Sequence, residues 1–257
     1  MPVDYVEFEE AREAPGLRMI VVMGVPSPWG EAAKGILHVK NIPWKAVRLD
    51  QGNDAMAEWA GGQRSGPVAF LDDEAPRDGW AEILLLAERL APEPALLPRD
   101  AAERATLLGL CHEICGEQGL GWVRRLQGIH AGLQGETGFP KPVAAYLASK
   151  YGYRESDAST YVARTKELLA LLSGRLHAQR EIESPYYHGH TLTALDIYSA
   201  TFMALVAPLP PEQCAIVEPM RAAFESIDPE TASAVDPILL EHRDFVYAKH
   251  LELPLSI

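Results

Sequence analysis

Ser27 is a candidate for chemistry because of its place in the sequence. It lies in the segment 25–31, Val-Pro-Ser-Pro-Trp-Gly-Glu, between an apolar run that favours a strand and a stretch with helical periodicity. A hydroxyl at the first turn of a helix lies close to unpaired N–H groups and to the positive end of the helix dipole, and both favour an anion. The same position suits a helix cap, with Pro28 at the favoured first helical position. The sequence therefore leaves two compatible roles for Ser27, a cap and a group that stabilises an anion.

A second candidate is the pair Gly66-Pro67, which precedes a short apolar run. Proline cannot donate to a β-ladder, so Pro67 must stand at the start of a strand, at a bend or at a sheet edge. The local sequence alone does not decide whether the bond between the two residues is cis or trans. We expect a strand to begin at this pair.

The three cysteines, Cys111, Cys115 and Cys214, match neither a metal site nor a disulfide framework. Cys111 and Cys115 are four residues apart and hence on one face of a helix. Structural zinc needs four ligands, and no second ligand pair with suitable spacing lies nearby. An odd number of cysteines in a chain of this size also argues against disulfides. We predict buried, reduced thiols and no metal site.

His188 and His190 precede a strong helix start. Thr193 and Asp196 have the spacing of a capping box, in which an acidic side chain three positions into the helix binds back to the capping residue. Neither histidine has further candidate ligands nearby, so a loop or surface role is favoured over metal binding. The sequence contains no Gly-x-Ser-x-Gly, no Gly-rich phosphate loop with Lys and no His-Glu-x-x-His. Hydrolase, kinase and zincin chemistry therefore have no support.

The pattern of apolar residues divides the chain into two halves at a Pro-rich stretch, 91–98. The first half alternates between short apolar runs and helical stretches, whereas the second is nearly all helical. This pattern predicts an α/β unit followed by a helical bundle. The first 17 residues stand outside it, and an arm and an extra edge strand both fit them. The predicted strands cover 18–24, 45–49 and 67–71, and the predicted helices cover 29–40, 54–59, 80–90, 101–126, 143–151, 156–180, 193–206 and 211–224.

The charge balance disfavours several classes of partner. Thirty-six acidic and 23 basic residues give a net charge of −13 and an isoelectric point of about 5.1, which repels nucleic acids and anionic lipids. No apolar run approaches the roughly 20 residues that a membrane-spanning helix needs, and the first residues are acidic where a signal peptide would be basic. We expect a cytoplasmic protein with no nucleic-acid or membrane partner.

Several of these features, in this order, resemble the cytosolic glutathione transferase superfamily of the serine type. Four of these features precede the Pro-rich linker at 91–98. They are the predicted strand ahead of Ser27, the Ser-Pro-Trp-Gly helix start, the Gly66-Pro67-Val68 segment and the helix that ends Leu-Leu-Ala-Glu-Arg-Leu at residue 90. After the linker, residues 189–197 are similar to the family's helical-domain motif, in which a glycine is followed four residues later by a Thr or Ser that caps a helix with Asp three residues further on. The resemblance runs from about residue 18 to at least residue 224.

The resemblance implies an α/β plus all-α fold with an N-terminal thioredoxin-like domain followed by a C-terminal helical bundle. We place an N-terminal extension at 1–17, the thioredoxin-like glutathione-binding domain at 18–92 and the all-helical domain at 99–257. Members of the family are usually symmetric homodimers, so the resemblance also implies a homodimer.

Five residues of the first domain match positions where the family binds its co-substrate glutathione. The serine at the position of Ser27 stabilises the glutathione thiolate, so the resemblance gives Ser27 the catalytic role; a free thiol has a pKa near 8.5, and a hydroxyl donor at a helix N-terminus raises its thiolate fraction. Gly66 and Pro67 match the segment that pairs with the cysteinyl part of glutathione. Asp78 and Gly79 match the pair that binds its γ-glutamyl end, with one departure, because the family usually has Glu or Gln followed by Ser.

In the family the electrophile lies between the two domains, and Trp29, Trp122 and Tyr146 are the side chains that we expect to line its pocket. The resemblance therefore predicts a glutathione transferase that conjugates the glutathione thiolate to a small apolar electrophile. Two alternatives stay open. One is a glutathione-dependent lyase, etherase or isomerase with a narrow substrate, and the other is a relative that binds a ligand or partner without turnover, which the altered Asp78-Gly79 pair motivates.

Overall fold

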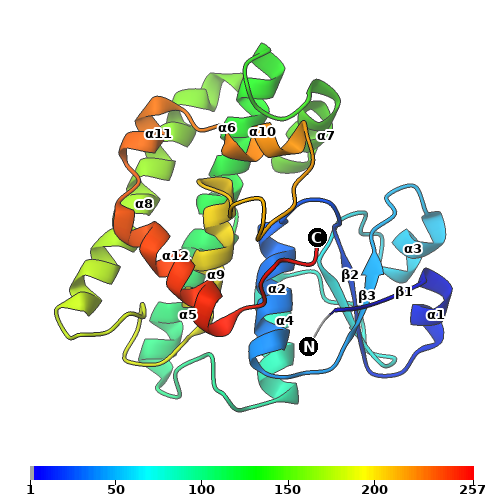
Figure 1. The fold of residues 1–257 in the computed structure, drawn as a ribbon. Helices are drawn as coiled ribbons and strands as arrows, with labels where there is room; N and C mark the ends of the chain where they lie inside the picture. The colour runs from blue at the N-terminus through cyan, green and yellow to red at the C-terminus, as the bar shows by residue number, and fades with distance from the viewer. Residues whose placement is uncertain (1–2) are drawn as a thin grey trace.

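The computed structural model describes residues 3–257, which form a small sheet flanked by helices and a larger bundle of helices (Figure 1). The predicted fold class, an α/β unit followed by an all-helical unit, is confirmed. Within residues 3–257, no helix is both long enough and apolar enough to cross a bilayer.

The sheet has four strands in the order β1-β3-β2-β4. β1, β3 and β2 run parallel, and β4 runs antiparallel to β2. β4 begins directly after Pro67, where the missing N–H does not interrupt the ladder. The strands are β1 (Asp4–Val6), β2 (Leu17–Val21), β3 (Lys45–Arg48) and β4 (Val68–Leu71).

Helices cover both faces of this sheet. Met19 and Val21 of β2 belong to the buried cluster formed with α2 (Pro28–Val39) and α4 (Trp80–Leu90). Ile20, between them, belongs to the opposite cluster with α1 (Phe8–Glu13) and α3 (Asp54–Trp59). This alternation is what a strand buried on both sides requires. Figure 1 shows α2 and α4 on the side of the sheet that faces the bundle, and α1 and α3 on the other.

Residues 4–13, inside the predicted N-terminal extension, join the sheet unit. β1 pairs with β3, and Ala11 of α1 is fully buried beside the sheet. The buried Arg18 guanidinium ties this segment down by donating to the carbonyl oxygens of Ala11 (3.2 Å) and Gly16 (2.7 Å). The segment is thus an extra edge strand with a helix rather than an arm. Residues 1 and 2 of the predicted extension lie outside the described residues.

The second unit is a bundle in which α6, α8 and α9 form the centre, and α5, α7 and α12 pack around them. Short 3₁₀ turns at Glu155–Asp157 and Met203–Leu205 extend two of its helices. The helices are α5 (Ala101–Cys115), α6 (Leu120–Gln134), α7 (Lys141–Tyr151), α8 (Ala158–Arg180), α9 (Ala194–Phe202), α10 (Met220–Glu225), α11 (Pro229–Ser233) and α12 (Pro237–His250).

Two predicted helices of this unit are wrong, and the reasons are local. The stretch 101–126 is two helices, because Gly116 and Gly119 bracket a tight turn in which Gln118 has a φ of +62°. The stretch 211–224 is helical only from residue 220 onward, directly after Pro219. The sequence pattern also gave no sign of α12, because its buried face includes the polar side chains of His242 and Arg243.

The Pro-rich linker is held by one buried lysine. The Lys40 ammonium at the end of α2 forms an ion pair with Glu88 (2.6 Å) and donates to the carbonyl oxygens of Ala91 (2.7 Å) and Pro94 (2.9 Å). Further along, the Leu96 carbonyl oxygen accepts from the N–H of Ala194 at the start of α9 (2.9 Å). These contacts fix where the bundle begins relative to the sheet unit.

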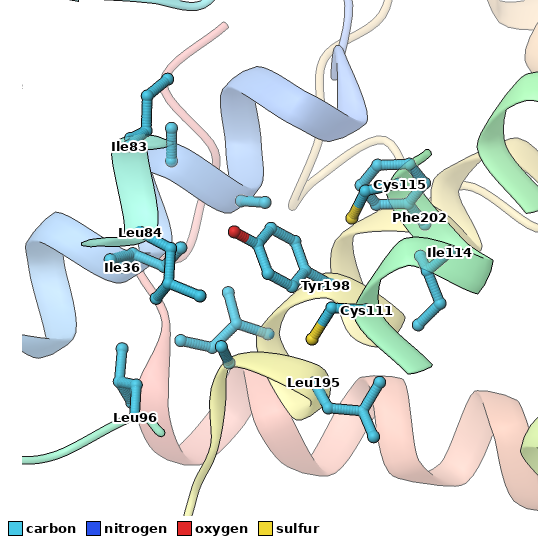
Figure 2. Packing of buried hydrophobic residues seen from close by; sticks show 14 of the residues in the cluster. Ile36, Ile83, Leu84, Leu96, Cys111, Ile114, Cys115, Leu195, Tyr198 and Phe202 are labelled. Carbon is cyan, nitrogen blue, oxygen red and sulfur yellow. The ribbon is translucent and has the colours of Figure 1, made fainter. Parts of the chain in front are cut away.

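The two units share one continuous apolar core. Figure 2 shows Ile36 of α2 and Leu84 of α4 facing Cys111 of α5 and Tyr198 of α9, all of them 2% exposed or less. The Tyr198 hydroxyl donates to the Trp80 carbonyl oxygen at the start of α4 (3.0 Å), which satisfies a polar group that this packing buries. A core of this kind holds the sheet unit and the bundle in one relative position.

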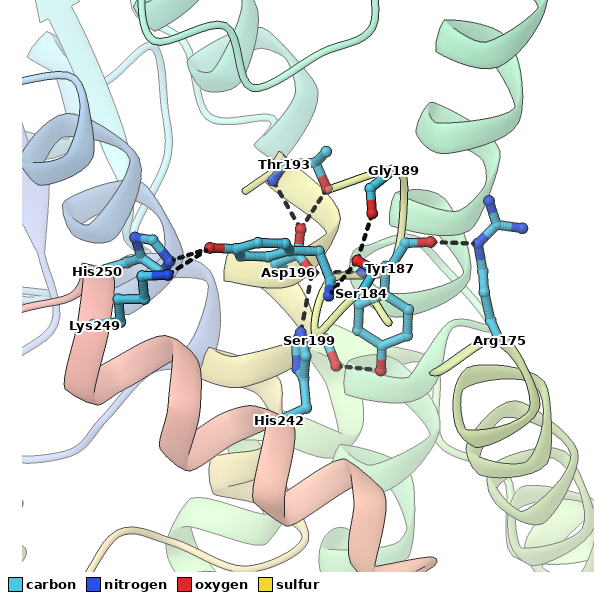
Figure 3. A network of polar contacts seen from close by, with 11 residues as sticks. Arg175, Ser184, Tyr187, Gly189, Thr193, Asp196, Ser199, His242, Lys249 and His250 are labelled. Atoms are coloured by element: carbon cyan, nitrogen blue, oxygen red, sulfur yellow. Dashed lines mark hydrogen bonds and ion pairs between the residues drawn. The ribbon is translucent and has the colours of Figure 1, made fainter. Parts of the chain in front are cut away.

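A buried carboxylate organises the start of α9 (Figure 3). Asp196 accepts hydrogen bonds from the N–H (2.8 Å) and hydroxyl (2.7 Å) of Thr193, which places it in the predicted capping box. It also accepts from the N–H of Tyr187 (2.8 Å) and contacts His242 Nε2 of α12 (3.0 Å). One side chain thereby joins α9, the loop before it and α12.

We expect Asp196→Ala to lower the free energy of unfolding by roughly 3–5 kcal/mol, because it leaves buried donors without an acceptor. Asp100→Ala is the matched control: Asp100 caps α5 in solvent by accepting from Ala102 and Glu103 N–H groups, and its loss should cost about 0.5–2 kcal/mol. Urea unfolding followed by circular dichroism measures both. Equal losses in the two variants would contradict the organising role of Asp196.

Candidate active site

A cavity of about 600 Å³ lies between the sheet unit and the bundle; we call it the interdomain cleft. Seven of the eight predicted site residues line it, and Gly79 does not. The sheet unit contributes polar groups and backbone, and the bundle contributes mostly aromatic and apolar side chains. The seven residues are Ser27, Trp29, Gly66, Pro67, Asp78, Trp122 and Tyr146.

Ser27 stands at the N-terminus of α2 with its side chain on the cleft. Its carbonyl oxygen accepts from the Glu31 N–H (2.8 Å), as a capping residue's does, but its hydroxyl makes no cap hydrogen bond to the helix. The residue is 8% exposed, so the hydroxyl lies in a sheltered place next to unpaired helix N–H groups. A hydroxyl in this position can donate to an anion such as a thiolate.

Gly66 and Pro67 lie beside the end of β2, and their peptide bond, which the local sequence left undecided, is cis. A Cβ atom at position 66 would lie 3.0 Å from the Ile20 carbonyl oxygen and 3.4 Å from Val21 Cα. Glycine therefore lets this segment approach the sheet closely. Residues 65–67 line the cleft, where their backbone can pair with an extended ligand.

The pair Asp78-Gly79 is divided between the cleft and the helix that follows. Asp78 lines the cleft, is exposed, and has no ion-pair partner within residues 3–257, so its carboxylate can bind a cationic group. The Gly79 N–H instead donates to the Glu82 carboxylate (3.0 Å), which closes the first turn of α4. A ligand carboxylate that used this N–H would have to displace Glu82.

The aromatic wall of the cleft comes from both units. Trp122 of α6 packs edge-on against Tyr151 of α7, with ring centroids 4.7 Å apart, and Trp29 of α2 lies 6.4 Å from the same tyrosine. The Tyr146 hydroxyl accepts from Gln51 Nε2 of the sheet unit (3.1 Å) and so bridges the cleft opening. These rings form an apolar surface that suits a small aromatic or aliphatic group.

Trp29 is fixed from behind. Its indole N–H donates to the Cys115 carbonyl oxygen (2.9 Å), and its ring packs edge-on against Phe202 at 4.8 Å between centroids. Gly121 of α6 makes this possible, because a Cβ there would collide with the Phe202 ring and lie 3.0 Å from Trp29 Cη2. The wall nearest to Ser27 is therefore rigid.

Three comparisons with known proteins bear on this geometry. Neither the known family models nor the curated proteins contain a match, but solved structures match over nearly the whole chain. A glutathione transferase family member from Pseudomonas fluorescens, solved with two glutathione bound, is 14% identical with a TM-score of 0.61, over 91% of this chain and 89% of that one. A glutathione S-transferase from Methylobacterium radiotolerans in complex with glutathione sulfonate is 18% identical with a TM-score of 0.59, over 94% and 97%.

A maleylacetoacetate isomerase from Anaeromyxobacter dehalogenans, with bound dicarboxyethyl glutathione and citrate, is 18% identical with a TM-score of 0.52, over 92% of this chain and 88% of that one. The chain has the glutathione transferase fold. At identities of 14–18%, the likeness shows the fold and not the reaction.

Some residues of the cleft in this glutathione transferase fold were missed by the sequence analysis. Arg125 stands three residues after Trp122 on α6, and Lys150 stands four residues after Tyr146 on α7. These spacings place each pair on one helix face, so helical periodicity applied to the predicted wall residues would have found both cations. Gln51, Ser65, Trp80 and Tyr151 also line the cleft.

The cysteines lie away from this site. Cys111 and Cys115 are buried in the core between the units, and Cys214 is buried near the end of the bundle. Within residues 3–257, no group of three or more His, Cys, Asp or Glu side chains is arranged to hold a metal ion. His188 lies 3.5 Å from the Glu103 carboxylate on the bundle surface. None of these groups reaches the interdomain cleft.

We expect the folded protein to react slowly with a thiol reagent at pH 7. Burial raises the pKa of Cys214 to about 11 and raises that of the Cys111 and Cys115 thiols as well. A pKa near 11 leaves about one thiol in 10⁴ as thiolate at pH 7, against a few per cent for an ordinary cysteine. The release of thionitrobenzoate should therefore be at least about 100-fold slower than from free cysteine, and three thiols should react at once in guanidinium. A fast-reacting thiol in the native protein would contradict this.

Proposed function

We propose that the protein is a glutathione-dependent enzyme that transfers the glutathione thiolate to a small electrophile held in the interdomain cleft. The observation that carries the proposal is that Ser27, whose hydroxyl makes no cap hydrogen bond, lines the same cavity as the aromatic wall of the bundle. A nucleophile at Ser27 and an electrophile against Trp122 would meet within one sheltered space. The solved structures with glutathione bound support glutathione as the co-substrate.

Each residue of the sheet unit has a defined part in this proposal. Ser27 donates to the sulfur and, with the N-terminus of α2, favours the thiolate over the thiol. The backbone at Gly66 and Pro67 pairs with the cysteinyl part of glutathione, and the Asp78 carboxylate binds its α-ammonium. Gly79 belongs to the same region, but its N–H becomes available to the γ-glutamyl carboxylate only when Glu82 turns away.

The electrophile would lie between Trp29, Trp122 and Tyr146. The thiolate sulfur forms a bond to its electrophilic carbon, and the leaving group departs with the bonding electron pair or, in an addition, the adjacent carbon takes up a proton from water. The proposed enzyme binds its electrophile between two domains, a glutathione-binding domain at 18–92 and an all-helical domain at 99–257. It acts as a homodimer, as the resemblance implies.

A second candidate function is the binding of a ligand without turnover. The observation in its favour is the Gly79 N–H, which the Glu82 carboxylate already occupies where a transferase of this fold would bind its co-substrate. A third candidate function is an isomerase that acts through the same thiolate. The similarity to the maleylacetoacetate isomerase suggests maleylacetoacetate as the first substrate to test.

We expect Ser27→Ala to lower the rate of conjugation at pH 7 by about 10- to 100-fold, since a hydrogen bond to a charged group contributes roughly 1.5–3 kcal/mol. Loss of the donor raises the pKa of the bound thiol toward its free value, so part of the rate should return at higher pH. The pH dependence of conjugation, with glutathione binding measured separately, tests this.

Ser65→Ala is the control for the Ser27 experiment, because it removes a hydroxyl from the same cleft but not from a helix N-terminus. We expect its pH profile to match that of the wild type. An unchanged profile in Ser27→Ala would overturn the catalytic role. If the wild type binds glutathione but turns over no electrophile, this result would favour the binding function over the transferase function.

Two acidic residues beside Gly79 should have opposite effects on glutathione affinity. Asp78→Ala should weaken binding by about 3- to 10-fold, because it removes the partner of the α-ammonium. Glu82→Ala should strengthen binding by about 2- to 5-fold, because it frees the Gly79 N–H and removes a negative charge beside the γ-glutamyl carboxylate. Calorimetric titration with reduced glutathione measures both. Weaker binding in both variants would contradict this placement of glutathione.

A further inference from the structure

The bundle side of the interdomain cleft carries positive charge in a protein whose net charge is −13. Arg125 of α6 and Lys150 of α7 line the cleft there, and Asp78, on the sheet unit, is the one acidic side chain among the described lining residues. Arg125 lies one helical turn from Trp122, and Lys150 one turn from Tyr146, so both cations belong to the wall proposed to hold the electrophile.

Arg125 is 8% exposed and lacks the partners that a buried guanidinium normally has. Within residues 3–257, it forms no ion pair, and its Nε atom has no hydrogen-bond partner. The guanidinium lies between the rings of Phe139 (5.3 Å) and Phe224 (5.4 Å), with the Tyr151 hydroxyl beside it. The aromatic faces hold the group in position but do not satisfy its N–H donors.

The preceding residue shows how this protein satisfies an arginine that serves the fold. Arg124, equally buried at 6% exposed, donates to the carbonyl oxygens of Leu205 (2.9 Å) and Ser226 (3.1 Å) and to the Gln127 side chain. Every branch of that guanidinium therefore has an acceptor. For Arg125, by contrast, residues 3–257 supply no carboxylate, and the buried Nε has no acceptor.

Lys150 adds a second positive charge at the edge of the same wall. Lys150 forms no ion pair with any of residues 3–257. Its ammonium lies 5.6 Å from the centre of the Tyr151 ring. Lys150 is exposed at the protein surface, but the atoms packed near its ammonium on the cleft side and the charge of Arg125 lower its pKa. Two cations that lack carboxylate partners repel each other across a partly apolar space, and a bound anion would relieve that repulsion.

We propose that the electrophile of this cleft carries a carboxylate on its apolar body, and that Arg125 binds this carboxylate while Lys150 adds attraction at the cleft opening. This inference rests on the proposed function for the identity of the reaction, and on the two cations for the charge of the substrate. The rings of the wall hold the apolar body, and a planar guanidinium suits a carboxylate better than a spherical ion because it offers paired N–H donors.

The test uses two S-substituted glutathiones of nearly the same shape: S-(4-carboxybenzyl)glutathione carries a carboxylate, and S-(4-carbamoylbenzyl)glutathione carries an uncharged amide in its place. Calorimetric titration of the wild type should give a dissociation constant at least about 10-fold lower for the carboxylate. Arg125→Met should remove most of this preference while it leaves the affinity for unsubstituted glutathione within about threefold. Lys150→Met should reduce the preference by about two- to threefold.

Lys141→Met is the matched control, since it removes the same charge from the exposed start of α7, away from the cleft lining. Its carboxylate preference should equal that of the wild type. Equal affinities for the two ligands in the wild type would overturn the inference, and this measurement needs no variant to fold. A loss of affinity for unsubstituted glutathione in Arg125→Met as large as the loss for the carboxylate ligand would also overturn it, because the cation would then serve the co-substrate.

A pair of ligands without glutathione separates this inference from the proposed function. The wild type is titrated with 4-ethylbenzoate and with uncharged 4-ethylbenzamide. If glutathione does not bind but the benzoate still binds more tightly than the benzamide, and Arg125→Met removes that difference, the proposed function fails and the anion site stands. If glutathione binds and neither charged ligand is preferred, the anion site fails and the proposed function stands.

Discussion

The fold depends on one buried carboxylate, Asp196, which fixes the start of α9 and ties it to α12. All nine residues of α9 are buried, so a shift of this helix would disturb side-chain packing on every side. Tyr198 of this helix donates to the Trp80 backbone at the start of α4, and Phe202 packs against Trp29 at the start of α2. Both helix starts that border the cleft are therefore positioned by α9, and the site is as rigid as that helix.

The two units supply different chemistry to the cleft they share. The sheet unit offers a hydroxyl at a helix N-terminus, a backbone edge and the Asp78 carboxylate, which suit a peptide with an ammonium and a thiol. The bundle offers rings and the two cations, Arg125 and Lys150, which suit an apolar group with negative charge. Under the proposed function, the negative charge of the sheet unit and the positive charges of the bundle would orient a two-part ligand so that its reacting atoms meet near Ser27.

The sequence predicted those parts that depend on local patterns. The capping box at Thr193, the strand that begins after Pro67 and the succession of elements from β2 to α4 all follow from periodicity and turn chemistry. The break at residues 116–119 was missed because apolar spacing continues across the two glycines. The occupation of the Gly79 N–H by Glu82 was missed as well, because it depends on one side-chain conformation at a helix end.

The contrast between Arg124 and Arg125 also could not be predicted from the sequence, because both are arginines at neighbouring positions of one helix. Taking a guanidinium out of water is costly unless its donors find acceptors, and the fold supplies acceptors to Arg124 from the loops at 205 and 226. Arg125 receives no such acceptors. Its guanidinium is enclosed between the rings of Phe139 and Phe224 on the wall of the cleft. A buried cation with an unpaired donor costs the free protein stability, and an anion bound in the cleft, as we propose, would offset that cost.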